Sequence, residues 1–315
     1  ALWPGAIDRG RAWVAAAAVH EEVAGKALAR NARLTAGEAL ARASLYCHYG
    51  QGSAVDLEER KATQRRKEEL FKRAAPLLSP PLERVEIPFA ETPLPAYFRR
   101  PQGVKRPPVA ILLGGLDTTK EDYLDLNNLC AERGLATLAF DGPGQGELLH
   151  RGITWRIDLE RAIFAVLDDL STRPDIDPDR IGIIGRSTGG HYAPKAAAMD
   201  TRIKATVAWG AMYHMKNLRT MPESIKEGFL FASGCRTIDE ALKFFEPINL
   251  EGIAPNIKCP LLSVHGGRDF ITPTENATLM AREAGGPTEM LFWEDSGHCC
   301  HDRSHIVRPA MADFL

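Results

Sequence analysis

A serine that can act as a nucleophile is the strongest chemical signal in the sequence. Ser187 lies at the centre of residues 185–189, Gly-Arg-Ser-Thr-Gly, a G-x-S-x-G pattern. An apolar run typical of a strand precedes it (181–184), and a helix is expected over His191–Met199. On such a turn the serine side chain points out of the sheet, and the glycines let strand and helix approach closely. The pattern therefore predicts a nucleophile that attacks a carbonyl carbon.

The sequence also offers an acid and a base for this serine. A serine hydroxyl is a weak nucleophile unless a base takes its proton, and the base needs an orienting acid. Asp269 follows a predicted strand at Leu261–Val264, and His298 follows one at Met290–Trp293. In the α/β-hydrolase arrangement the acid and then the base follow the serine in this order. Alone, each would be an ordinary loop residue, but together they predict a triad of Ser187, Asp269 and His298.

Three other histidines are weaker candidates for the base. His301 is close to His298 but begins the predicted C-terminal helix, so its position makes it the second choice. His265 ends its strand, and His191 lies inside the helix after Ser187. Both are expected to be structural.

The negative charge that develops on the attacked carbonyl oxygen needs preorganised N–H donors. The backbone amide of Thr188 lies at the positive end of the helix that it starts. A second donor is expected from the loop after Val109–Leu113, where the glycines let the backbone approach a substrate. We predict the Leu116 amide as this donor, with Gly115 as the next candidate.

Two motifs resemble sites for other groups. Residues 298–301, His-Cys-Cys-His, could suggest a metal, but adjacent residues cannot easily converge on one tetrahedral ion. Residues 141–147, Asp-Gly-Pro-Gly-Gln-Gly-Glu, lack the G-x-G-x-x-G spacing of dinucleotide sites and predict a tight turn beside the pocket. We expect no metal and no cofactor.

Substrate contacts are expected from loops near the serine and from the segment 212–257, which contains aromatic and sulfur-containing side chains. The side chains of that segment could equally form its own small core, and the sequence leaves both readings open. The candidates for a substrate pocket are Gly115, Asp117, Trp155, Met212, Tyr213, His214 and Phe229.

Strands and helices alternate from residue 82 onward. Two antiparallel strands are expected over Leu82–Phe89 and Leu94–Arg99. Later apolar runs, separated by helical segments, predict buried parallel strands. The alternation predicts a mostly parallel, doubly wound α/β sheet. The runs are Val109–Leu113, Ala136–Phe140, Ile181–Ile184, Ala205–Trp209, Leu261–Val264 and Met290–Trp293.

Two helical regions interrupt this alternation. Residues 1–81 form a helical N-terminal region, and residues 212–257 are too long for a single crossover. The latter predict two or three helices, with breaks at Pro222, Gly234 and Pro247. An insertion there would lie over the carboxyl ends of the strands, where α/β sheets bind ligands. We expect both regions to form a cap on a catalytic domain made of residues 82–211 and 258–315.

The composition of the chain limits the kinds of binding partner that we expect. A formal net charge of −2 gives no reason to expect nucleic acid or an anionic membrane surface. No apolar stretch reaches membrane-spanning length, and the six cysteines show no framework spacing, which suits a reducing compartment. We therefore expect a cytoplasmic protein that acts on a small molecule, without nucleic-acid or membrane partners. A homodimer is one assembly compatible with the sequence.

Four segments together resemble one subgroup of the α/β-hydrolases. The subgroup includes 2,6-dihydroxypseudooxynicotine hydrolase, the fungal polyketide-shortening hydrolases and the fermentation–respiration switch proteins. The resemblance implies the α/β-hydrolase fold, a helical cap and triad roles for Ser187, Asp269 and His298. The segments are 114–121, Gly-Gly-Leu-Asp-Thr-Thr-Lys-Glu; 141–146, Asp-Gly-Pro-Gly-Gln-Gly; 185–190, Gly-Arg-Ser-Thr-Gly-Gly; and 297–300, Gly-His-Cys-Cys.

The same resemblance implies a serine hydrolase, in a group that includes enzymes cleaving carbon–carbon bonds next to a ketone. We expect hydrolysis of a C–C bond in a β-diketone, an aryl ketone or a polyketide-type compound. A carboxylesterase or thioesterase needs the same residues and is the main alternative. A catalytically silent binding protein on the same scaffold is a further alternative, against which the complete triad argues.

Overall fold

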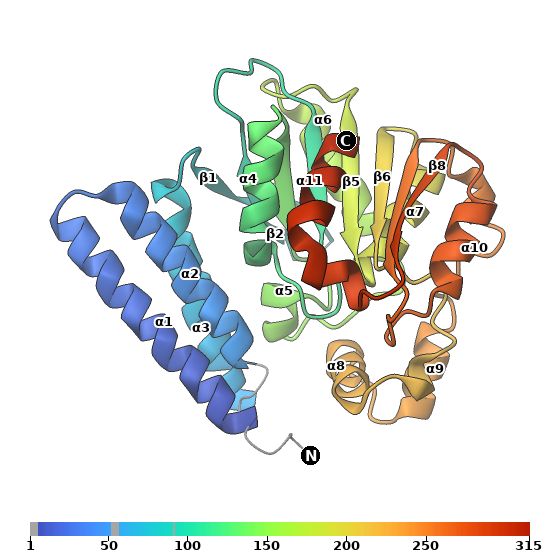
Figure 1. Cartoon of the computed structure of the whole chain (residues 1–315), viewed down its shortest axis with the longest axis horizontal. Helices are drawn as coiled ribbons and strands as arrows, with labels where there is room; N and C mark the ends of the chain where they lie inside the picture. The colour runs from blue at the N-terminus through green and yellow to red at the C-terminus, as the bar shows by residue number, and fades with distance from the viewer. Residues whose placement is uncertain (1–5, 52–56, 91) are drawn as a thin grey trace. The chain divides into compact units, whose positions relative to one another are not determined.

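An eight-stranded sheet organises the chain (Figure 1). The computed structural model describes residues 6–51, 57–90 and 92–315. The strands lie in the order β1-β2-β4-β3-β5-β6-β7-β8, and the pairs from β4 across to β8 are parallel. This confirms the predicted doubly wound, mostly parallel sheet. The strands are β1 (Leu82–Ile87), β2 (Leu94–Arg99), β3 (Val109–Leu113), β4 (Ala136–Phe140), β5 (Ile181–Arg186), β6 (Ile203–Trp209), β7 (Leu261–Gly266) and β8 (Thr288–Trp293).

Helices connect the parallel strands. In Figure 1, α4 and α11 lie side by side in front of the sheet, and Arg308 binds Asp125 between them at 2.7 Å. α7 packs against β5 and β6, and α6 packs against α7. The connecting helices are α4 (Leu124–Glu132), α5 (Gly146–His150), α6 (Glu160–Thr172), α7 (Gly189–Met199) and α10 (Glu275–Glu283), and α11 (Ser304–Phe314) follows the last strand.

Burial follows the position of each strand in the sheet. Every residue of β3 and β4 is buried, because these inner strands have neighbours on both sides. The prediction that β8 is buried was wrong. β8 is the last strand of the sheet, and Glu289 and Met290 are exposed.

The chain divides into two compact units. One runs to Val85 and takes in Tyr97–Arg100, and the other comprises Glu86–Ala96 and Pro101–Leu315. The first contains α1 (Ala6–Ala29), α2 (Arg33–Gln51) and α3 (Leu57–Ala74). The sequence predicts a strongly charged helix over residues 55–78, and its first two residues, Val55 and Asp56, lie outside the described residues.

Small side chains let the helices of the first unit pack closely. α2 buries Ala36, Leu40, Ala43 and Cys47, whose spacing of three to four residues places them on one face of the helix. The Ser44 hydroxyl donates to the Lys67 carbonyl of α3 at 2.9 Å. This hydrogen bond satisfies a buried hydroxyl between two helices that approach closely.

The segment between β6 and β7 contains α8 (Glu223–Ser233) and α9 (Ile238–Phe245) with two short 3₁₀ turns. α8 begins after Pro222 and ends at Gly234, whose φ of +75° suits a residue without a Cβ. Phe229 and Phe245 pack edge to face, with ring centroids 5.2 Å apart. None of the described helices combines the length and apolar character needed to cross a bilayer.

We predict that Gly185→Ala strongly destabilises the second unit. The added Cβ would lie 2.1 Å from the Gly189 carbonyl oxygen, a backbone atom that cannot move without reshaping the turn. Overpacking typically costs about 1–3 kcal/mol, and we expect the upper end of this range because the close atom belongs to the backbone. Urea denaturation measures the loss. The matched control is Gly25→Ala in α1, where a Cβ meets nothing within 4 Å and should stabilise the helix by up to about 1 kcal/mol. Equal stability of the two variants would contradict the prediction.

Candidate active site

Ser187 occupies a strained turn between β5 and α7. Its φ is 55°, in the left-handed region that residues with a Cβ rarely adopt. Its backbone amide donates to the Trp209 carbonyl at 2.8 Å, which ties the turn to the end of β6. The turn presents the Ser187 hydroxyl from a half-buried position.

Hydrogen bonds join Ser187, His298 and Asp269 in a chain. His298 Nε2 lies 3.0 Å from Ser187 Oγ, and its Nδ1 lies 2.7 Å from Asp269 Oδ2. The three residues follow β5, β8 and β7, whose carboxyl ends share one edge of the parallel sheet. The structure thus brings together the three residues that the sequence singled out. The arrangement can pass a proton from the serine to the histidine while the carboxylate orients the ring.

Thr272, which the sequence analysis missed, holds the Asp269 carboxylate. Its hydroxyl donates to Asp269 Oδ2 at 2.6 Å, and its amide donates to Oδ1 at 2.8 Å. The Ile271 amide adds a third hydrogen bond at 2.9 Å. An aspartate followed three residues later by a threonine was the available signal, since such a pair often closes a turn.

The charges of the site shift the pKa of both titratable partners. Burial raises the pKa of Asp269, but hydrogen bonds from His298 and Thr272 outweigh burial and lower it. Burial lowers the pKa of His298, but Cys299 and the bonded Asp269 carboxylate outweigh burial and raise it above 6.5. The carboxylate therefore stabilises the imidazolium that forms when the histidine accepts a proton.

The backbone amides of Leu116 and Thr188 are the candidate donors for an oxyanion. Among the residues that the structure describes, neither the Leu116 amide nor the Thr188 amide donates a hydrogen bond to another group. A Cβ added at Gly115 would lie 2.9 Å from Ser187 Cβ and 3.5 Å from its Oγ. The loop after β3 thus approaches the serine as closely as a glycine permits, which suits an oxyanion site.

The competing histidines have other partners. His301 Nε2 lies 2.9 Å from Arg186 Nη2, and His265 Nε2 lies 2.8 Å from the Thr272 carbonyl oxygen. His191 is fully buried, and burial lowers its pKa to about 3, so it stays neutral at ordinary pH. The structural interpretation of His191 and His265 agrees with these contacts.

Of the candidate pocket residues, Gly115 lies directly against Ser187, and Asp117 is exposed in the same loop. Tyr213 lies elsewhere: its hydroxyl donates to Glu283 of α10, and its ring joins a buried cluster with Leu250, Ile257 and Met280. Of the two readings that the sequence left open for Tyr213, these contacts favour a position in a core, beside α10.

The remaining pocket candidates are buried. Phe229 packs edge to face on Phe245 within the helical insertion, and Trp155 donates from Nε1 to the Tyr192 hydroxyl at 3.2 Å. The Met212 carbonyl lies 3.2 Å from His191 Nδ1. His214 forms an antiparallel bridge with Asn249. For Phe229, these contacts favour the alternative that it belongs to the insertion's own core.

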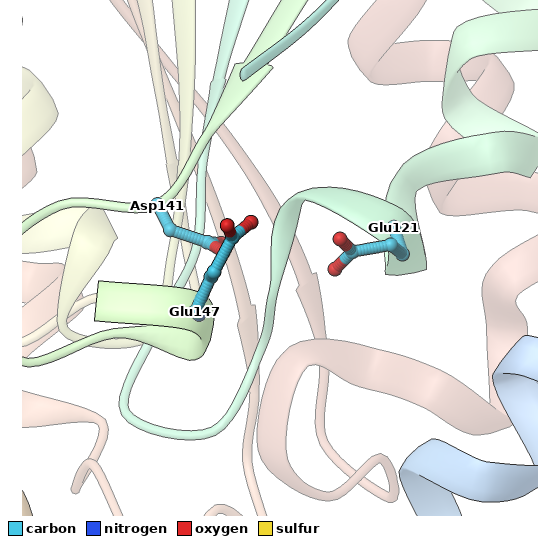
Figure 2. Close-up of side chains that lie close together, drawn as sticks. All are labelled: Glu121, Asp141 and Glu147. Carbon is cyan, nitrogen blue, oxygen red and sulfur yellow. The ribbon is translucent and has the colours of Figure 1, made fainter. Parts of the chain in front are cut away.

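Three carboxylates converge near the loop after β3: Glu121, Asp141 and Glu147 (Figure 2). The ammonium of the fully buried Lys120 lies 2.7 Å from Glu121, 2.7 Å from Asp141 and 2.9 Å from Glu147. A metal ion would have to compete with this ammonium for the same oxygen atoms. The cluster is therefore an ion-paired network, and a buried charge needs such partners.

Known proteins resemble this chain over most of its length. The FrsA-like family, described as esterase FrsA-like, matches residues 9–289. The 2,6-dihydropseudooxynicotine hydrolase of Paenarthrobacter nicotinovorans is 36% identical over 305 residues, 96% of this chain and 82% of that protein. The alpha/beta hydrolase gkaG of Penicillium citrinum is 36% identical over 220 residues, 63% of this chain but only 49% of the fungal protein.

Solved structures are also similar to this chain. A crystal structure of the 2,6-dihydroxy-pseudo-oxynicotine hydrolase matches with a TM-score of 0.90 at 36% identity, covering 96% of this chain and 86% of that one. AbyA5 matches with a TM-score of 0.79 at 19% identity, covering 96% and 85%, and shows the likeness of fold alone.

We predict that Asp269→Asn lowers the pKa of His298. The neutral amide no longer stabilises the imidazolium, so we expect a fall of about one to three units. The His298 ring must be neutral to take the serine proton, and in the wild type it becomes neutral as the pH rises through the raised pKa of His298. NMR titration of the His298 ring measures both values. The control is Asp295→Asn, which removes an exposed carboxylate three residues from His298. An unchanged His298 pKa in Asp269→Asn would contradict the prediction.

Proposed function

The chain belongs to the FrsA-like esterase family and is a hydrolase with the α/β-hydrolase fold. On that premise we propose that it cleaves a carbon–carbon bond next to a carbonyl group in an aromatic or polyketide-type small molecule. Ser187 is the nucleophile, His298 the general base and acid, and Asp269 the orienting carboxylate. The hydrogen-bonded chain of these three side chains is the observation that carries the proposal.

The first half of the reaction forms an acyl-enzyme. Ser187 Oγ attacks the carbonyl carbon as its proton passes to His298 Nε2. The oxyanion accepts hydrogen bonds from the Leu116 and Thr188 amides. When the tetrahedral intermediate collapses, the bond to the leaving group breaks, and His298 gives its proton to the leaving carbon.

The second half releases the acid. Water attacks the ester on Ser187 while His298 takes a proton from it, and Ser187 leaves as the alcohol with that proton. Asp269 remains ionised throughout, consistent with its lowered pKa. The cycle regenerates the enzyme without a cofactor.

An esterase or thioesterase is the second candidate, and the family description favours it. It uses the same residues and differs only in the atom that leaves. Cleavage of a C–C bond additionally requires a leaving carbanion stabilised as an enolate or by an electron-rich ring. The name of the 36% identical relative, a hydrolase of 2,6-dihydropseudooxynicotine, and the resemblance to a group with C–C hydrolases support the first candidate.

The insertion at 212–257 acts as a cap that shapes the substrate space. A Cβ added at Gly228 of α8 would lie 2.9 Å from the Leu116 side chain, so α8 packs directly on the residue that offers an oxyanion donor. The Trp155 amide donates to the Ala232 carbonyl at 2.7 Å and anchors the same helix. The substrate's non-reacting part therefore contacts this insertion.

Ser187→Ala should lower kcat by about 10⁴-fold or more, because loss of a triad nucleophile has this effect in serine hydrolases. Turnover of an activated aryl ester and of a β-diketone measures the loss, and circular dichroism checks the fold. Ser171→Ala, which removes a hydroxyl that caps the Leu167 carbonyl in α6, is the control and should retain activity. Retained turnover in Ser187→Ala would refute the nucleophile assignment.

A substrate screen separates the two reaction classes. β-Diketones and aryl ketones with a stabilised leaving carbanion should be hydrolysed with a higher kcat/KM than simple aryl esters of similar size. Product analysis by mass spectrometry identifies the bond that breaks. Turnover of the esters alone would exclude C–C hydrolysis and establish the esterase alternative.

A further inference from the structure

Gln145 lies behind the loop that faces Ser187 and uses its whole amide group on backbone atoms. It is fully buried between β4 and α5. Its Nε2 donates to the Gly114 carbonyl at 2.7 Å and to the Gly115 carbonyl at 2.9 Å. Its Oε1 accepts a hydrogen bond from the Gly142 amide at 3.0 Å. One side chain thus fixes two consecutive carbonyls of the loop after β3.

Because each peptide group is planar, fixing these two carbonyls also fixes the direction of two N–H groups, those of Gly115 and Leu116. In a trans peptide the carbonyl and the following amide point in opposite directions. The Gly114 carbonyl shares its peptide with the Gly115 amide, and the Gly115 carbonyl shares its peptide with the Leu116 amide. With both carbonyls held toward Gln145, both amides point away from it.

The same loop lies against the nucleophile at Gly115. The Cβ position of Gly115 lies 3.5 Å from Ser187 Oγ. Consecutive backbone amides that point the same way form a concave site for an anion. We propose that Gln145 is a positioning residue that orients the Gly115 and Leu116 amides toward the oxyanion, an inference that rests on the proposed function.

The loop needs such a restraint because of its composition. Glycine populates backbone conformations that other residues avoid, so the peptides around Gly114 and Gly115 can rotate at little cost. A rotated Gly115–Leu116 peptide would turn its carbonyl oxygen toward the developing negative charge. Two hydrogen bonds from Gln145 oppose this rotation.

The buried charge network holds Gln145 in place. Asp141 Oδ1 accepts from the Lys120 amide at 2.8 Å, and Oδ2 accepts from Lys120 Nζ at 2.7 Å and from the Glu147 amide at 3.0 Å. Lys120 continues the loop after β3, and Asp141 begins the segment that carries Gln145. Figure 2 shows the side chains of Asp141, at the end of β4, and Glu147, at the start of α5, close together, with Glu121 facing them. The two segments are therefore tied together beside Gln145.

Gln145→Met tests the proposal, since methionine nearly matches the shape of glutamine but donates no hydrogen bond. We expect kcat to fall by about tenfold to a hundredfold, approaching the loss of an oxyanion donor, while KM stays within about threefold. The rate of labelling by a fluorophosphonate should fall by a similar factor, because its phosphoryl oxygen occupies the oxyanion site. Gln145→Asn keeps the amide but is one methylene too short, and should show the same pattern.

Asn127→Leu is the matched control for loss of a buried amide. Asn127 of α4 accepts a hydrogen bond from the Thr137 hydroxyl at the start of β4, away from Ser187. We expect it to lower the unfolding midpoint as the Gln145 variants do, with kcat and the labelling rate unchanged. Equal losses of kcat in Asn127→Leu and in the Gln145 variants would reduce Gln145 to a structural residue and overturn the proposal.

Other outcomes separate this inference from the proposed function. If Ser187→Ala abolishes turnover and the Gln145 variants keep wild-type kcat and labelling rate, the positioning role is refuted and the proposed function stands. If Ser187→Ala remains active, the proposed function itself fails. If neither Gln145 variant folds while Asn127→Leu does, Gln145 is required for folding rather than for kcat, which also refutes the proposal.

Discussion

The site depends on the close approach of three backbone segments at the carboxyl edge of the sheet. Ser187 adopts a φ of 55°, a conformation that costs about 1–3 kcal/mol for a residue with a Cβ. Glycines make it sterically feasible: a Cβ at Gly189 would lie 2.4 Å from the Gly114 carbonyl oxygen, and one at Gly115 would lie 2.9 Å from Ser187 Cβ. The nucleophile, the start of α7 and the loop after β3 therefore share a space without room for side chains.

Two polar networks support that space from different sides. On one side, Asp269 and Thr272 hold His298 beside the serine. On the other, Lys120, Asp141 and Gln145 hold the loop after β3. A buried ion pair adds little net stability, because desolvation offsets the attraction. In this chain the buried ion pairs connect the loop after β3 to the segment after β4, through the contacts of Lys120 with Asp141 and Glu147.

The residues that carry out the proposed reaction are not the ones that select the substrate. The nucleophile, the base and the oxyanion donors are the same for ester and C–C hydrolysis, so they do not distinguish the substrates. In the proposed function the insertion with α8 and α9 shapes the space around them, because Gly228 of α8 lies close to the Leu116 side chain. Phe229 and Phe245 give that insertion a core of its own, so it has a defined shape against which a substrate can pack.

The sequence by itself determined the order of strands and helices along the chain and the residues most suited to nucleophilic chemistry. Apolar runs bounded by loops are local signals, and so is a serine flanked by glycines. Asp269 and His298 could be found because chain order and strand ends limit the choices. The predicted strands agree closely with the observed ones, except that β8 is partly exposed at the sheet edge.

Only the tertiary structure decided which side chains meet across distant segments. Tyr213 lies in a buried cluster and donates to Glu283, where the sequence had left a core and a pocket position equally open. Lys120 meets Asp141, and Gln145 meets Gly114, over separations of 21 and 31 residues. Such contacts depend on the register of β3 and β4 and on the direction of each loop. Hydrogen bonds need donor and acceptor within a few tenths of an ångström, and no local sequence pattern encodes that precision.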